Sequence, residues 1–331
     1  MDGFKVALVG LGGQVMPDWV PARLTEAGIN FVARECTTRQ ELARFAGDAD
    51  VVWIFGDSPV MCADNLEVLE RCGGIIRSGS GTDKVPVAEA NGRGIVVANT
   101  PAAVEESVSD QTIGLLLAIT RQIAARDRVV RQGKWEPNLP ALQWHLQGQT
   151  LGLVGFGHIA QAVARKMSGF EMKILVYDPY VAAGTLAGYS VKTVELDELL
   201  TQSDFVSLHC PLTEETYHLI SERELRLMKR NAILINTSRG AVVDEPALLQ
   251  ALREDWIGAA GLDVVDPEPP DPDNPLFQLE NVVVTPHIGG YSGYSMQRAW
   301  ELSVETAIDL AQGRWPRSVV NPFVKPRWKL S

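Results

Sequence analysis

The sequence predicts an α/β protein with doubly wound parallel sheets, and three observations support this fold class. The chain has 331 residues, and at roughly 150 residues per domain this length favours two domains. Short apolar runs rich in β-branched residues alternate with amphipathic stretches along almost the whole chain, as βαβ units require. Most of these runs are continuously hydrophobic, which is typical of strands covered on both faces by helices.

The expected strands and helices follow one another along the chain. Strands are expected at residues 6–9, 51–55, 74–77, 95–98, 151–155, 173–178, 205–209, 232–236, 258–264 and 281–285. Helices are expected at residues 64–72, 105–131, 158–168, 197–202, 245–253 and 293–312. The pattern alone does not mark a domain border, although the two long helices are candidates for carrying the chain between domains.

Composition and charge exclude several classes of protein. Acidic residues outnumber basic ones 41 to 30, for a formal net charge of −11, so we expect neither nucleic acid nor an anionic membrane as a partner. No apolar run approaches the roughly 20 residues of a membrane helix, and the N-terminus lacks a signal-peptide pattern. The cysteines show no C-x-x-C pair and no framework spacing, which predicts a cytoplasmic protein with reduced thiols.

The motif with the clearest link to a cofactor begins at Gly155. An apolar strand runs into the segment G-F-G-H-I-A and then into a helix, which is the G-x-G-x-x-A form of the dinucleotide fingerprint. Gly155 permits the tight turn, and Gly157 lets the backbone approach a pyrophosphate at the helix N-terminus. Asp178, about 20 residues further on, is placed to bind the ribose hydroxyls of NAD and to repel the 2′-phosphate of NADP. We therefore expect NAD, with an ordinary βα turn as the alternative.

A second glycine-rich turn lies near the N-terminus, between Gly10 and Val15. Val15 is too large for the third position of the fingerprint, and Pro17 interrupts the helix start that should follow. We interpret this segment as a βα turn of another domain rather than as a nucleotide site.

Arg239, Glu268 and His287 each follow a predicted strand in the C-terminal half of the chain. The carboxyl ends of parallel strands meet at one edge of the sheet, where ligands bind, so these side chains are expected to converge beside a nicotinamide. Taken singly, each has a structural alternative: a surface ion-pair partner, a solvated loop acid and a core histidine, respectively. Their joint placement favours a catalytic set.

The chain resembles the D-isomer-specific 2-hydroxyacid dehydrogenase family over nearly its whole length. The motifs that carry the resemblance are, in order, G-S-G-T-D at 79–83, N-T-P at 99–101, the fingerprint, H-C-P-L-T at 209–213, the three polar segments and V-N-P at 320–322. Ala160, Asp110 and Cys210 depart from the usual family residues. None of these departures removes a residue that does chemistry.

The resemblance implies a Rossmann cofactor domain inserted into a discontinuous, flavodoxin-like substrate domain. The substrate domain would comprise residues 1–101 and 293–331, and the NAD-binding domain residues 102–292. It also implies a homodimer in which the cofactor domains embrace through an arm at 105–146. Trp135 and Trp144 are interface candidates in that arm, with core packing as the alternative.

The reaction that the resemblance implies is hydride transfer between NAD(H) and a D-2-hydroxy acid/2-oxo acid pair. His287 would donate or accept the proton, a task suited to a group that titrates near neutrality. Glu268 would orient the ring and favour the imidazolium. Arg239 would bind the substrate carboxylate and polarise the carbonyl, as a planar and permanently charged fork can.

Binding residues are implied as well. Backbone amides of Ser80 and Gly81 would bind the substrate carboxylate, and Asp263 would face the nicotinamide carboxamide. Trp53 and Phe55 would present aromatic surface, which favours an uncharged or apolar substituent, as in glyoxylate, hydroxypyruvate, pyruvate or a longer 2-oxo acid. The rest of the implied cofactor site is Thr112, Gly155, Gly157, His158, Ile159, Asp178, His209, Cys210, Pro211, Thr216, Thr237, Ser238, Gly289 and Gly290.

Two other functions remain open on the sequence. One is a D-3-phosphoglycerate dehydrogenase, in which the resemblance places an arginine near Phe55; the other is a non-enzymatic, NAD-binding corepressor-like protein. A methyltransferase would leave the Arg–Glu–His set unexplained. We expect no metal, because the histidines show no H-x-H or H-E-x-x-H spacing, and no hydrolase elbow G-x-S-x-G occurs.

Overall fold

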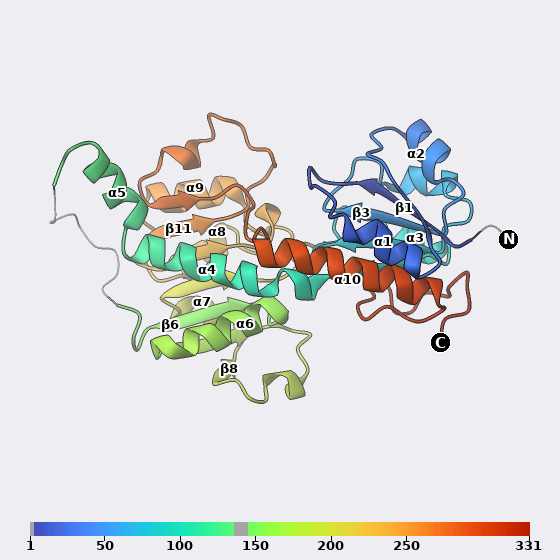
Figure 1. The fold of residues 1–331 in the computed structure, drawn as a ribbon. Helices are drawn as coiled ribbons and strands as arrows, with labels where there is room; N and C mark the ends of the chain where they lie inside the picture. The colour runs from blue at the N-terminus through green and yellow to red at the C-terminus, as the bar shows by residue number, and fades with distance from the viewer. Residues whose placement is uncertain (1–2, 136–144) are drawn as a thin grey trace. The chain divides into compact units, whose positions relative to one another are not determined.

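The computed structural model describes residues 3–135 and 145–331 and divides the chain into two compact units (Figure 1). Unit 1 comprises Met1–Val104 and Tyr291–Ser331, and unit 2 comprises Glu105–Gly290. Each unit is built on one parallel sheet with helices on both faces, so the predicted fold class is confirmed.

Unit 1 contains a five-stranded sheet in the order β2-β1-β3-β4-β5, which is the flavodoxin-like order. Helices α1 and α10 contact each other on one face of this sheet, while α2, η1 and α3 pack on the other (Figure 1). The elements are β1 (Lys5–Gly10), α1 (Trp19–Glu26), β2 (Asn30–Ala33), α2 (Arg39–Ala46), β3 (Val51–Phe55), η1 (Ala63–Val68), β4 (Gly74–Ser78), α3 (Val87–Gly92), β5 (Val96–Asn99), η2 (Pro101–Ala103) and α10 (Gly293–Ala311).

Unit 2 contains a seven-stranded sheet in the order β12-β11-β10-β9-β6-β7-β8. Its first half comprises α4 (Glu105–Thr120), α5 (Ile123–Arg131), β6 (Thr150–Val154), α6 (His158–Met167), η3 (Ser168–Phe170), β7 (Lys173–Tyr177), η4 (Ala183–Leu186), β8 (Val191–Thr193) and α7 (Leu196–Gln202). Its second half comprises β9 (Phe205–Leu208), α8 (Glu222–Leu227), β10 (Ile233–Asn236), η5 (Gly240–Val242), α9 (Glu245–Arg253), β11 (Ala259–Leu262), η6 (Pro275–Gln278) and β12 (Val282–Val284).

The strand order of unit 2 is that of the Rossmann fold with one further strand. Helices α4 and α6 lie side by side on one face (Figure 1), and their buried side chains form one hydrophobic cluster with the sheet. Helices α7, α8 and α9 cover the other face. The order reverses between β6 and β9, and ligands of open α/β sheets bind outside the carboxyl ends of the strands at such a switch point.

Three expectations about elements need correction. The helix expected at 105–131 is two helices, because Gln122 adopts the left-handed conformation with φ 53° and ends the regular helical path. The helix expected at 64–72 is the shorter 3₁₀ segment η1. The pattern does not predict β2 or β8, because both are short edge strands with mostly exposed or half-buried residues and a weak apolar signal.

The turn from Gly10 to Val15 is a βα turn in unit 1, as predicted. Helix α1 begins only at Trp19, so no helix N-terminus faces this turn.

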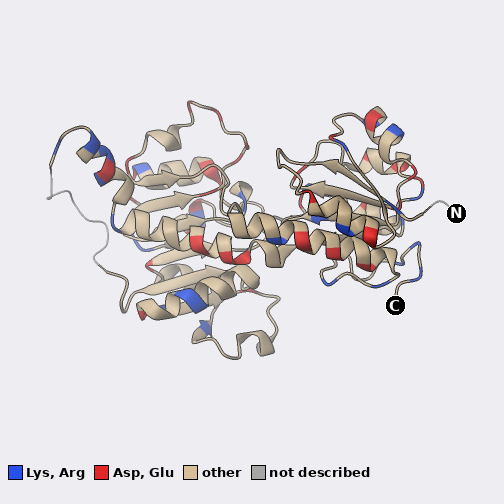
Figure 2. Ribbon diagram, in the orientation of Figure 1, with Lys and Arg blue, Asp and Glu red and all other residues tan. Residues whose placement is uncertain are grey.

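Lys and Arg residues are interspersed with Asp and Glu on each unit rather than gathered on one element (Figure 2). Among the described residues, no helix is both long and apolar enough to cross a membrane.

Candidate active site

The glycine loop joins β6 to α6 in a conformation that only glycine accommodates. Gly155 has φ +86°, and a Cβ atom there would lie 2.8 Å from the backbone nitrogen of Cys210. Gly157 is the N-cap of α6, has no side chain to cap the helix and faces open space. His158 and Ile159 begin α6, so their uncapped N–H groups belong to a helix N-terminus of the kind that binds phosphate. This arrangement fits the pyrophosphate of a dinucleotide.

Asp178 follows β7 and reaches back to the glycine loop. Its Oδ2 accepts a hydrogen bond from the Phe156 backbone N–H at 2.7 Å, and its Oδ1 accepts one from the Tyr180 N–H at 2.8 Å. The carboxylate is therefore held beside the loop by two backbone donors. This is the position from which an acidic residue binds the adenosine ribose in Rossmann folds.

His209 and Cys210 follow β9, on the other side of β6 from Asp178. Burial lowers the pKa of His209 to about 4, so the imidazole is neutral near pH 7 and is a poor candidate for the catalytic acid. Its Nε2 lies 2.9 Å from the Ser207 hydroxyl. Burial raises the pKa of the Cys210 thiol to about 11, which keeps that side chain unreactive. The backbone of these two residues lies against Gly155 of the glycine loop.

The loop that follows Cys210 is closed by its own side chains. Thr216 donates from its hydroxyl to the Pro211 carbonyl at 2.6 Å and accepts from the Thr213 backbone N–H at 2.8 Å. Thr112 on α4 and Thr237 after β10 pair through their hydroxyls at 2.9 Å. Every residue predicted for the cofactor site belongs to unit 2.

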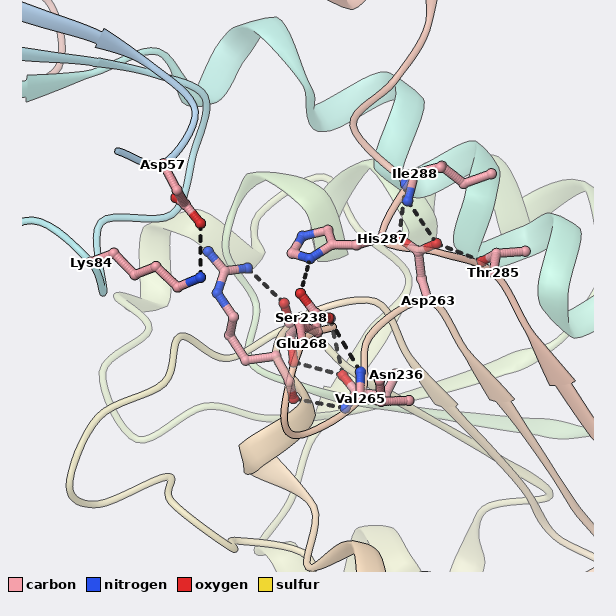
Figure 3. A network of polar contacts seen from close by, with 12 residues as sticks. Asp57, Lys84, Asn236, Ser238, Asp263, Val265, Glu268, Thr285, His287 and Ile288 are labelled. Carbon is pink, nitrogen blue, oxygen red and sulfur yellow. Dashed lines mark hydrogen bonds and ion pairs between the residues drawn. The ribbon is translucent and has the colours of Figure 1, made fainter. Parts of the chain in front are cut away.

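His287 and Glu268 form the central polar pair of unit 2 (Figure 3). His287 follows β12 and Glu268 lies in the loop after β11. The imidazole Nδ1 donates to Glu268 Oε2 at 2.7 Å, and the Val265 backbone N–H donates to Oε1 at 3.3 Å. The His287 side chain is 45% exposed, so its ring is both anchored and accessible. This is the geometry of a histidine that exchanges protons with a ligand.

The surroundings of Glu268 hold the pKa of its carboxyl below the usual range. Burial raises its pKa, but the hydrogen bond and charge of His287, the Val265 N–H and the charge of Arg239 outweigh burial and hold the pKa below its usual range. Arg239, Glu268 and His287 all lie in unit 2, and the charge of Arg239 is one of the influences on this carboxyl. Their convergence beside a bound nicotinamide stays a prediction.

The loop that carries Arg239 is shaped by Asn236, the last residue of β10. Asn236 donates to the Arg239 carbonyl at 2.8 Å and accepts from the Ser238 N–H at 3.0 Å and hydroxyl at 2.9 Å. The next residue, Gly240, packs so tightly that a Cβ atom there would lie 2.1 Å from the Val265 carbonyl. The Arg239 loop and the Glu268 loop are thus in direct backbone contact.

Asp263 holds the His287 segment through several hydrogen bonds, which Figure 3 shows in part. Its side chain accepts from the Thr285 hydroxyl at 2.5 Å, the Ile288 N–H at 3.0 Å and the Gly289 N–H at 2.7 Å. Its backbone carbonyl accepts from the His287 N–H at 2.8 Å. Asp263 is only 2% exposed. The role that the structure supports for Asp263 is therefore to hold this loop, not to present an open carboxylate to a carboxamide as expected.

His287 adopts the left-handed conformation with φ 53°, which costs energy for a residue with a Cβ atom. The hydrogen bonds to Asp263 offset that cost. Gln111 on α4 extends the network, because its Nε2 donates to the Thr285 hydroxyl at 2.9 Å. Gln111 and Thr285 are absent from the predicted site. Residues 111 and 285 lie far apart in sequence, and no local pattern links them.

Of the residues predicted to bind substrate, Ser80, Gly81, Trp53 and Phe55 lie in unit 1, whereas Arg239 lies in unit 2. Ser80 and Gly81 follow β4, where Asn99 donates to the Ser80 carbonyl at 2.7 Å. Trp53 needs correction: it is 0% exposed and its indole donates to the Ser78 hydroxyl at 2.8 Å, so it is a core residue and offers no surface to a substrate. Phe55 needs the same correction, because it is only 5% exposed and packs against Trp300 with ring centroids 4.4 Å apart.

A cationic cluster in unit 1 is absent from the predicted site. Arg77 in β4 donates to Asp57 Oδ1 at 3.3 Å, and Lys84 lies 3.0 Å from Asp57 Oδ2. The Arg77 side chain is 14% exposed. An arginine near the end of an otherwise apolar, buried strand is the sequence signal that identifies this cluster.

Comparisons with known proteins agree with this geometry. Residues 113–289 match the family model described as the NAD binding domain of D-isomer specific 2-hydroxyacid dehydrogenases. A glyoxylate reductase of Korarchaeum cryptofilum is 47% identical over 252 residues, 74% of each chain. A D-3-phosphoglycerate dehydrogenase of Methanocaldococcus jannaschii is 38% identical over 295 residues, 88% of this chain and 56% of that protein.

Among solved structures, an NADPH-dependent glyoxylate/hydroxypyruvate reductase of Sinorhizobium meliloti in complex with NADP and malonate is similar. It has a TM-score of 0.84 and 28% sequence identity, and the match covers 98% of both chains. The extent of these matches and the nicotinamide-binding fold identify an oxidoreductase that uses NAD. The chain therefore belongs to the D-isomer-specific 2-hydroxyacid dehydrogenase family.

Proposed function

We propose that this protein reduces a small 2-oxo acid of the glyoxylate or hydroxypyruvate class to the corresponding D-2-hydroxy acid with NADH. The observation that carries the proposal is the His287–Glu268 pair at 2.7 Å with the Arg239 charge acting on it, in the unit that also holds the dinucleotide loop. The reductase names of relatives that are 41–47% identical support the substrate class.

The three side chains have complementary tasks. Arg239 binds the substrate carboxylate and polarises the carbonyl, because its guanidinium keeps its charge and offers paired donors. His287 donates a proton from Nε2 to the oxygen that develops negative charge, and it accepts that proton in the reverse direction. Glu268 holds the ring through Nδ1 and stabilises the positive charge on the imidazole.

The cofactor is held by the residues of the glycine loop. Bound NADH supplies the hydride, which is chemistry that no side chain can provide. The N–H groups at the start of α6 bind the pyrophosphate, and Asp178 binds the adenosine ribose. The loops after β9 and β10, including Thr216, Thr237 and Ser238, border the rest of the dinucleotide.

In the substrate unit, we assign the second carboxylate oxygen to the backbone amides of Ser80 and Gly81. The glyoxylate reductase names of the similar proteins support a small substituent on the 2-oxo acid. The test is oxidation of NADH, followed by absorbance, against 2-oxo acids graded by length and charge. Turnover with glyoxylate or hydroxypyruvate is expected. NADH binding without turnover of any 2-oxo acid would instead support the corepressor-like function.

A second candidate function is favoured by the Arg77 cluster. Arg77 and Lys84 both contact the carboxylate of Asp57, and two cationic side chains at this place suit a substrate with a second anionic group, as in a D-3-phosphoglycerate dehydrogenase. The same assay with 3-phosphohydroxypyruvate distinguishes the two functions. If the wild-type protein prefers 3-phosphohydroxypyruvate and Arg77→Met loses that preference, the phosphorylated acid becomes the assigned substrate in place of glyoxylate.

We also propose a homodimer and a cytoplasmic location. Helix α5 has no buried residue, and Ile123, Val130 and Trp135 expose apolar side chains on and just after it, which supports the arm as an interface. Trp144, the other candidate, lies outside the described residues. All four cysteines are free, which supports a reducing compartment.

A further inference from the structure

The loops after β7 and β9 are joined by a side-chain contact that the reaction does not explain. The Tyr180 hydroxyl, after β7, donates to the Glu215 carboxylate, after β9. The strand β6 lies between β7 and β9 in the sheet. A contact between these two loops therefore spans two strand spacings, about 10 Å, on the edge of the sheet where the glycine loop leaves β6. It borders the end of the cofactor site that holds Asp178.

Asp178 and Glu215 both form a hydrogen bond with Tyr180. Asp178 accepts from the Tyr180 N–H at 2.8 Å, so it lies at the start of the segment that carries the Tyr180 ring. The Glu215 hydrogen bond and charge raise the pKa of the Tyr180 phenol most, and Tyr177 and Asp178 add to that effect. Tyr180 therefore contacts both carboxylates, Asp178 through its backbone N–H and Glu215 through its hydroxyl.

Among the described residues, neither Asp178 nor Glu215 forms an ion pair with a lysine or arginine, whereas Lys192, on the neighbouring strand β8, pairs with Glu198. The Tyr180 side chain is exposed, and the hydrogen bond of its hydroxyl keeps the Glu215 carboxylate on the ligand-binding edge. Two carboxylates without an ion-pair partner repel a phosphate bound near them.

We propose that Glu215, held in place by Tyr180, is a specificity-determining residue that acts with Asp178 to select NAD over NADP. The inference rests on the proposed cofactor site. Asp178 occupies the position that binds the ribose hydroxyls. A 2′-phosphate on that ribose carries roughly two negative charges, and it would lie close to both carboxylates. A relative of the same fold was solved with NADP. The choice of cofactor therefore depends on local residues rather than on the fold.

The test measures binding directly, with no turnover involved. The dissociation constants of NADH and NADPH are measured by nicotinamide fluorescence, with NADPH also measured by competition against bound NADH so that weak binding is captured. The variants are Glu215→Gln, Asp178→Asn and the double variant. Glu214→Gln is the matched control, because it removes the same charge one residue away and has no contact with Tyr180.

For Glu215→Gln, we expect the ratio of NADPH to NADH dissociation constants to fall about fivefold or more, as removal of one nearby repulsive charge predicts. Glu214→Gln is expected to leave that ratio within about twofold of wild type. Added salt should narrow the difference between wild type and Glu215→Gln, because ions screen the repulsion. Tyr180→Phe leaves the Glu215 charge in place but removes the hydrogen bond that positions it. The ratio of dissociation constants should therefore fall in this variant too, but by less than in Glu215→Gln.

Equal ratios in wild type and Glu215→Gln, with NADH still bound, would overturn this inference and leave the proposed function intact. The inference is also overturned if Glu214→Gln shifts the ratio of dissociation constants as far as Glu215→Gln does. Wild-type protein that binds neither nucleotide would overturn the proposed function itself.

Discussion

At the residue scale, the site depends on a histidine whose backbone and side chain are both constrained. The backbone of His287 is left-handed, with φ 53°, and its N–H is held by the Asp263 carbonyl. The ring is held separately by Glu268. Because two different residues hold the backbone and the ring, the imidazole presents its free nitrogen in a defined direction. This orientation matters for a proton that must arrive at one oxygen.

The proton-transfer role of His287 predicts the behaviour of His287→Asn. Asparagine tolerates the left-handed backbone and removes the acid, so kcat should fall at least about a hundredfold while the NADH dissociation constant stays near its wild-type value. Steady-state kinetics and fluorescence titration measure the two quantities. His218→Asn is the matched control, because His218 also has positive φ and lies outside the catalytic set. Comparable turnover in the two variants would remove His287 from its assigned role.

The lowered pKa of Glu268 predicts a pH effect. Burial raises the pKa of this carboxyl, but the hydrogen bond and charge of His287, the Val265 N–H and the charge of Arg239 outweigh burial and lower the pKa. The carboxylate loses its hold on the ring when it is protonated, so the wild-type kcat/KM should fall as the pH falls through the lowered pKa of Glu268. Glu268→Gln cannot titrate at this position, so its profile should lack that acid-side fall. A pH–rate profile from about pH 3 to 9 measures the difference, and profiles of the same shape in both proteins would contradict this role of the Glu268 charge.

At the element scale, three neighbouring strands deliver the three catalytic candidates. β10, β11 and β12 are adjacent in the sheet, and their carboxyl ends are about 4.8 Å apart. The loops that follow them carry Arg239, Glu268 and His287, so side chains 48 residues apart in the chain become neighbours. Helix α4 adds Gln111 from outside the sheet.

The link from α4 to the His287 loop predicts the effect of Gln111→Met. Methionine keeps similar volume but cannot donate to Thr285, so the Thr285–Asp263 contact loses its support. We expect kcat to fall about threefold to tenfold, the value of one hydrogen bond, with little change in NADH affinity. Gln250→Met removes a comparable helix-surface bond on α9 and should leave kcat unchanged. An equal loss in both variants would point to a general effect on stability.

At the scale of the whole molecule, each unit has its own sheet and its own hydrophobic core. The flavodoxin-like order of unit 1 and the Rossmann order of unit 2 each place a switch point at the carboxyl ends of the strands. The candidate catalytic set and all predicted cofactor residues belong to unit 2. Apart from Arg239, the residues predicted to bind substrate belong to unit 1, as does the Arg77 cluster.

The exposed apolar residues of α5 predict an oligomer interface, which substitution of those residues by aspartate should disrupt. Ile123 is 56% exposed and Val130 49% exposed, and α5 contributes no residue to a core. Ile123→Asp with Val130→Asp should convert a dimer into a monomer in sedimentation equilibrium. Val15→Asp, at an 89% exposed valine of unit 1, is the control and should stay dimeric. A wild-type monomer would contradict the proposed interface.

The sequence by itself determined the βα alternation, the dinucleotide loop with Asp178 and the strand-end positions of Arg239, Glu268 and His287. These features are predictable because apolar periodicity, glycine turns and parallel strand ends are local or follow from the fold class. Only the tertiary structure decided that Trp53 is a core residue, that Asp263 holds the His287 loop, that Gln111 contacts Thr285 and that Glu215 contacts Tyr180. Burial and hydrogen bonds between distant residues depend on how the elements pack, and no local pattern encodes that packing.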